Sequence, residues 1–126
     1  MSEYIQIITT SDSKDIASKI AHILVEEKIA ACVQVSGPIN STYEWKGKIE
    51  NTEEFYCIIK TRRELYNAVE SRIKSIHTYT VPEIIAIPII EGNKDYLDWL
   101  DNGVIPPSKY TAGETINPML YLMEKN

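Results

Sequence analysis

Hydrophobic and polar residues change their spacing along the chain, and each change predicts the start of a new element. Residues 4–10 alternate and are rich in β-branched side chains, which is typical of a strand. In the following segment the apolar residues recur at helical spacing and form one stripe, made of Ile16, Ile20, Ile23 and Leu24. Asp12 precedes this stripe, and its short carboxylate is predicted to cap the helix.

A long hairpin is predicted next, from Ala31 to Lys60. The run IAACVQV begins its first strand, which is broken or bulged near Gly37-Pro38 and resumes through Trp45. Lys46-Gly47-Lys48 reverses the chain, and residues 49–60 form the return strand.

The second half of the domain repeats the alternation of helix and strand. Thr61 to Glu64 matches a capping box, and a helix with one apolar face follows it, formed by Leu65, Val69, Ile73 and Ile76. The segment from Glu83 to Ile90 is apolar on both faces, which predicts a strand in the centre of the sheet or covered on both sides. Gly92-Asn93 then starts a short helix.

The predicted order, β-α-β-β-α-β plus a final helix, indicates an α+β, ferredoxin-like fold with a four-stranded antiparallel sheet. Residues 1–102 form this domain. Residues 103–126 form a C-terminal extension, in which Pro106-Pro107 imposes an extended path and residues 119–123 form an apolar cluster. We expect the extension to pack on the domain or on a neighbouring subunit.

The sheet has one face that no predicted helix covers, and the hairpin is longer than a compact sheet needs. The hairpin also carries four aromatic residues, namely Tyr43, Trp45, Phe55 and Tyr56. An exposed aromatic surface is costly in solubility, so we expect a homo-oligomer. The alternative is a monomer with a protruding hairpin.

Composition limits the classes of function. The 126 residues fit one domain, and a net charge of -5 without a basic run argues against a nucleic-acid surface. No apolar run approaches the ~20 residues of a membrane span, and no secretory signal is seen, so we expect a cytoplasmic protein. Equal spacing about Gly47 sets Cys32 opposite Arg62 and Cys57 opposite Gly37, which is too far apart for a disulfide.

Candidate chemistry gathers at the segment HTYTVPEIIAIPI. An imidazole, a phenol and a carboxylate (His77, Tyr79 and Glu83) stand at the start of an apolar strand, where ligand sites often lie. His77 also follows a helix end, where the dipole favours it, so a structural role is the alternative. His22, the other histidine, falls among charged residues on the wet face of the first helix.

Cys32 is either a small core residue or, with His77, a soft metal ligand of the kind that suits copper or zinc. The remaining ligands would come from Glu83, water or another subunit. Cys57 is assigned to the core. Lys60 could pair with Glu54 or Glu83, or contact a small anionic ligand.

Several segments together resemble the CutA family of divalent-cation tolerance proteins, over about Tyr4 to Asp101. These segments are AACV (30–33), YEWKGKIE (43–50), IIKTR (58–62), HTYTVPEIIAIPI (77–89) and DYLDWL (95–100). The resemblance implies a cytosolic homotrimer built through the long hairpins, related in architecture to PII signalling proteins, that binds copper or another divalent cation without an organic cofactor.

The resemblance implies roles for individual residues. Cys32 and His77 become the metal candidates, Lys60, Tyr79 and Glu83 line a cleft between subunits, and Tyr43, Trp45 and Trp99 are trimer contacts. Where some members have a further cysteine and a second histidine, this chain has Thr9 and Ile76, and Thr78 replaces a common proline.

Three functions therefore compete. The first is a trimeric metal-binding or cation-tolerance protein, and the second is a PII-like trimer that senses a small ligand or acts as a scaffold. The third is an enzyme with His77 and Glu83 as acid and base. No nucleophile or complete catalytic constellation is visible in the sequence, so we expect no enzyme.

Overall fold

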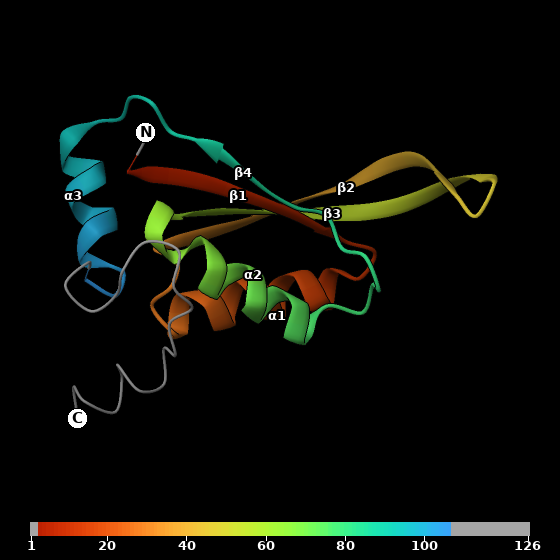
Figure 1. Ribbon diagram of the computed structural model, residues 1–126, viewed down its shortest axis with the longest axis horizontal. Coiled ribbons are helices and arrows are strands. Elements are labelled where there is room, and N and C mark those ends of the chain that lie inside the picture. Colours follow the sequence, from red (N-terminus) through yellow and green to blue (C-terminus); the bar gives the residue numbers. More distant parts are fainter. Residues whose placement is uncertain (1–2, 107–126) are drawn as a thin grey trace.

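The computed structural model describes residues 3–106 and confirms the predicted α+β, ferredoxin-like order of elements (Figure 1). The elements are β1 (Tyr4–Ser11), α1 (Lys14–Glu26), β2 (Cys32–Trp45), β3 (Lys48–Arg62), a 3-10 turn (Arg63–Leu65), α2 (Tyr66–Ile76), β4 (Ile84–Pro88) and α3 (Lys94–Asn102). No helix within this part of the chain is long and apolar enough to cross a membrane.

The four strands form one antiparallel sheet in the order β2-β3-β1-β4. Helices α1 and α2 lie side by side against one face, and the β2-β3 hairpin projects well beyond them (Figure 1). The core between these layers consists of fully buried aliphatic side chains, including Ile7, Ile20, Leu24, Ile59, Val69 and Ile73. Each such side chain contributes about 1.5–3 kcal/mol by leaving water, so the predicted apolar stripes account for the packing of both helices.

The cap of α1 differs from the prediction. Ser13 is the N-cap, with an extended backbone, and its hydroxyl accepts a hydrogen bond from the Ile16 amide at 3.2 Å. The prediction of Asp12 as the cap was therefore wrong by one residue. Two adjacent residues with short polar side chains can both cap a helix, and sequence alone does not choose between them.

The predicted capping box at Thr61 to Glu64 was also wrong. Strand β3 continues to Arg62, which turns the fully buried Thr61 towards the core, where its hydroxyl donates to the Ile29 carbonyl at 2.6 Å. A 3-10 turn follows, and α2 begins only at Tyr66, without a side-chain cap.

Strand β4 was predicted to be central or covered on both sides, and in a single chain it is neither. It is the five-residue edge strand of the sheet and pairs only with β1. Ile85 and Ile87 point to the face opposite the helices and are 48% and 43% exposed. The apolar pattern was read correctly, but one chain provides a cover for only one of its two faces.

The break in the hairpin near Gly37-Pro38 is confirmed, as a register shift between Ser36 and Ile39. Gly37 has a φ of 143°, and a Cβ there would lie 3.0 Å from the Glu54 carbonyl oxygen, so a side chain is excluded. The observed register differs from the prediction by two residues, one from the position of the turn at Lys46-Gly47 and one from this shift: Cys32 lies opposite Lys60 instead of Arg62, and Cys57 opposite Val35 instead of Gly37. Both cysteines are free thiols.

The first residues after α3 pack on the domain. Val104 and Ile105 are buried in the core, and the Ile105 amide donates to the Lys28 carbonyl at 2.9 Å. The rest of the predicted extension, residues 107–126, lies outside the described residues.

Candidate functional site

His77 directly follows α2 and reaches the end of β1. Its Nε2 lies 2.6 Å from the Thr10 carbonyl oxygen, and its Nδ1 lies 3.0 Å from the Tyr79 amide. Because the amide can only donate and the carbonyl can only accept, Nδ1 is the acceptor and Nε2 carries the proton. Both ring nitrogens are therefore used by the chain itself.

Tyr79 continues this contact towards β3. Its ring lies 4.6 Å from the ring of His77, and its hydroxyl donates to Glu54 Oε2 at 2.8 Å. Burial, and then the hydrogen bond to the Glu54 carboxylate, raise the pKa of Tyr79 far above its ordinary value. Glu54 is only 6% exposed, so the phenol of Tyr79 supplies a hydrogen bond to a carboxylate that is largely shielded from water. Together these bonds fasten the segment after α2 to the end of β1 and to the middle of β3.

Cys32 lies at the start of β2, directly opposite Lys60 on β3. The Cys32 thiol is free and partly exposed, and it lies on the face of the sheet opposite the helices. Burial, and then the neighbouring Cys32, raise the pKa of Tyr96 on α3. Lys60 Nζ donates to Gln34 Oε1 at 2.8 Å, so in one chain it pairs with neither of the acids expected from the sequence.

The two metal candidates lie at opposite ends of the sheet. Lys60, the partner of Cys32, pairs in turn with Gln6, whereas His77 contacts Thr10, four residues further along β1. At about 3.4 Å per residue along β1 and about 4.8 Å for each of the two strand spacings from β1 to β2, Cys32 and His77 are roughly 17 Å apart in one chain. One cation cannot bind both within a single protomer.

Glu83 and the predicted contact aromatics lie at the surface of the single chain. Glu83 is exposed just before β4, and within residues 3–106 it has no hydrogen bond or ion pair. Tyr43, Trp45 and Trp99 are 41%, 47% and 51% exposed. Tyr43 bonds to Thr52 across the hairpin at 2.8 Å, and Trp99 lies against Tyr96 on α3.

Residues 3–106 of one chain do not fit a copper site. No cluster of three or more His, Cys, Asp or Glu side chains with the spacing of metal ligands occurs among residues 3–106. His77 offers no free lone pair while it binds Thr10 and Tyr79. No local pattern predicts the contact of Tyr79 with Glu54, because the two residues are 25 positions apart and meet only in the folded chain.

Residues 5–103 match the family model described as CutA1 divalent ion tolerance protein. The chain is 43% identical over 94 residues to the divalent-cation tolerance protein CutA of Thermus thermophilus, a match that covers 75% of this chain and 91% of that protein. It is 41% identical over 98 residues to the Arabidopsis thaliana protein named Protein CutA, chloroplastic, covering 78% of this chain and 54% of that one.

A solved structure gives the same result in three dimensions. It is described as the periplasmic divalent cation tolerance protein CutA from Archaeoglobus fulgidus, and it superposes with a TM-score of 0.79. The identity is 45%, and the match covers 81% of this chain and 99% of that one.

Proposed function

The chain belongs to the CutA1 divalent ion tolerance protein family, and on this premise we propose that it acts in divalent-cation tolerance as a cytoplasmic homotrimer that binds a divalent cation, copper first among them. The observation that carries this proposal is the match to the family over residues 5–103, which spans β1 to α3.

The surface of the single chain supports assembly. The far half of the hairpin, residues 39–54, extends beyond the part of β3 that pairs with β1, so within residues 3–106 no strand pairs with either of its edges. A two-stranded ribbon is marginally stable by itself in water. Trp45 on this ribbon and Ile85 and Ile87 on β4 are exposed apolar side chains that another copy of the chain would cover.

In this proposal the cation binds where subunits meet. Cys32 supplies the thiolate, because it is partly exposed on the open face of the sheet, whereas Cys57 is fully buried. His77 contributes only if assembly or the metal releases its bonds to Thr10 and Tyr79. We propose no catalytic role, since His77, Tyr79 and Glu54 bind one another within the chain.

Copper titration of the purified apo-protein under reducing conditions tests the proposed site. We expect Cys32→Ser to weaken copper binding by at least about tenfold, the order of change expected on losing one ligand. The variant His77→Ala reports whether the imidazole takes part, and His77→Gln replaces it if alanine lowers stability. Cys57→Ala is the matched control, because its thiol is inaccessible. Unchanged copper affinity in the Cys32→Ser, His77→Ala double variant would exclude these ligands.

A further inference from the structure

A groove runs between α1 and β2, which is an edge strand of the sheet. Its volume is about 570 Å³, and the side chains that line it are those of Ser18, Ala21, His22, Val25, Glu26 and Val35. Three of these are apolar, and Val25 is 43% exposed although it is one of them. We refer to this hollow as the α1–β2 groove.

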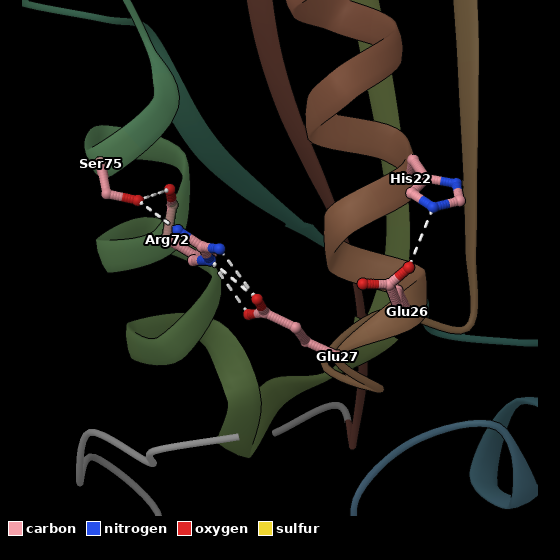
Figure 2. Close-up of polar contacts among 5 residues, drawn as sticks. All are labelled: His22, Glu26, Glu27, Arg72 and Ser75. Carbon is pink, nitrogen blue, oxygen red and sulfur yellow. Dashed lines mark hydrogen bonds and ion pairs between the residues drawn. The ribbon is translucent and has the colours of Figure 1, made fainter. Parts of the chain in front are cut away.

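The two sides of α1 differ in what covers them. On one side Glu27 accepts a hydrogen bond from Arg72 of α2 at 2.9 Å, and this contact bridges the two helices. On the other side, Figure 2 shows His22 and Glu26 pointing towards one another and away from α2. These two polar side chains border the α1–β2 groove, where the apolar Val25 is left partly uncovered.

The described chain ends beside this groove. Residues 103–105 pack against the connection between α1 and β2, residues 27–31, where the Ile105 amide donates to the Lys28 carbonyl at 2.9 Å. Lys28 directly follows the last turn of α1, which lines the groove. The chain that continues from Pro106 therefore starts close to the point where α1 and β2 are joined, at one end of the groove.

We propose that the apolar segment near the end of this same chain, residues 119–123 with the sequence Met-Leu-Tyr-Leu-Met, docks in the α1–β2 groove. The segment lies outside the described residues, and it follows the part of the chain that matches the family, residues 5–103. Grooves commonly hold short segments through a few apolar anchor side chains. Leucine and methionine suit this role opposite Ala21, Val25 and Val35, because methionine adapts to irregular gaps.

The length of the connection favours docking within one chain. Twelve residues, 107–118, separate Pro106 from Met119. A linker of this length that forms no element of its own spans about 20 Å on average. The groove is shorter, because α1 rises only about 10 Å from Ser18 to Val25. Such a tether gives an effective concentration on the order of 1 mM, so a segment with a dissociation constant of about 0.1 mM would be docked about nine-tenths of the time.

Docking would cover two apolar surfaces at once, that of the groove and that of the segment. It is independent of the cation site proposed above, because α1 covers the face of the sheet opposite to the one that carries Cys32.

Thiol labelling of the full chain tests the docking. In the Cys32→Ser background, Cys57 is fully buried, so Val25→Cys supplies the reactive thiol. We expect a maleimide to react with this thiol about tenfold more slowly than in the same protein carrying Leu120→Lys and Leu122→Lys. The two lysines release the segment, because they place charges among its apolar side chains.

Two controls separate docking from other effects of the substitutions. Thr111→Lys adds a charge to the linker and should leave the labelling rate of Val25→Cys unchanged. Lys74→Cys, at an exposed position on α2, should react at the same rate with and without the two lysines in the segment. Equal labelling rates of Val25→Cys with the native and the lysine-bearing segment would overturn the proposal.

Cross-linking identifies the chain that supplies the segment. In the Cys32→Ser background, Glu26→Cys at the groove and Glu124→Cys beside the segment are joined by a short bis-maleimide, and the mass is measured under denaturing conditions. We expect the mass of one chain. Chains joined in pairs would place the segment in the groove of another copy and overturn docking within one chain.

Discussion

Thr9 and Thr61 are both fully buried, but they differ in what their hydroxyls bind. The Thr61 hydroxyl donates to the Ile29 carbonyl, whereas Thr9 Oγ1 has no hydrogen-bond partner in the part of the chain that is described. A buried polar group without a partner costs about 1–3 kcal/mol. We predict that Thr9→Val raises the free energy of unfolding by about 1 kcal/mol, because valine keeps the shape and removes the hydroxyl.

Thr61→Val is the matched comparison and should lower the free energy of unfolding by about 1–2 kcal/mol, since it leaves the Ile29 carbonyl unpaired. Urea unfolding at one fixed protein concentration measures both. Equal losses of stability in the two variants would contradict the assignment of Thr9 as unsatisfied.

We predict that the free energy of unfolding depends on pH in the alkaline range because of the buried thiol of Cys57. Burial raises the pKa of its thiol from 9.0 to about 11. Above pH 9 the unfolded chain releases this proton while the folded chain keeps it, so stability falls as the pH rises from about 9 to about 11. The full effect is on the order of 2 kcal/mol.

In Cys57→Ala this part of the decline should disappear, although the variant is less stable at neutral pH. The measurement is urea unfolding at several pH values between 8 and 11. A slope equal to that of the parent protein would show that the thiol does not keep its proton in the folded state.

At the scale of elements, the carboxylate of Asp101 ties α3 to the sheet, beside the fully buried side chain of Leu100. Asp101 accepts hydrogen bonds from the hydroxyl of Tyr4 at 2.7 Å and from the guanidinium of Arg62, a side chain that is only 10% exposed. Arg62 also lies over the Tyr4 ring, at 5.3 Å from its centroid. We predict that Asp101→Asn costs about 1–2 kcal/mol of stability and raises amide hydrogen exchange in α3, because it weakens a partly buried ion pair.

Asp98→Asn is the control on the same helix. Asp98 pairs with Lys94 at 2.7 Å, but the two side chains are 54% and 86% exposed. Such surface pairs contribute less than about 1 kcal/mol. Exchange rates in α3 that respond equally to both substitutions would argue against the special role of Asp101.

At the scale of the whole molecule, we expect folding of each chain to be coupled to assembly of the proposed homotrimer. If the exposed ribbon and β4 are covered by other copies, stability depends on protein concentration. We predict the mass of a trimer by light scattering at low micromolar concentration. A tenfold rise in concentration should then raise the free energy of unfolding by about 0.9 kcal/mol per chain.

Trp45→Lys places a charge on the ribbon and should shift the mass towards smaller species, whereas Lys48→Gln, its cross-strand neighbour, should not. A monomer mass for the parent protein at these concentrations would exclude the trimer.

The sequence by itself determined the order of elements, the faces of both long helices and the bulge near Gly37, because these follow from local periodicity and from the backbone freedom of glycine. Several adjacent motifs in family order also determined the family. The local pattern was insufficient to predict the helix caps. Asp12 and Ser13 are adjacent and either could cap α1, and the Thr61 hydroxyl donates to the Ile29 carbonyl in the core instead of capping α2.

Only the tertiary structure decided what the candidate site residues bind. Cys32 and His77 were paired by chemistry alone, and the register of the sheet places them near opposite ends of β1. In the folded chain the Tyr79 hydroxyl donates a hydrogen bond to Glu54, and β4 lies at an edge of the sheet where its apolar outer side chains remain exposed. These outcomes depend on contacts between residues far apart in sequence, and such contacts leave no periodic pattern to be read.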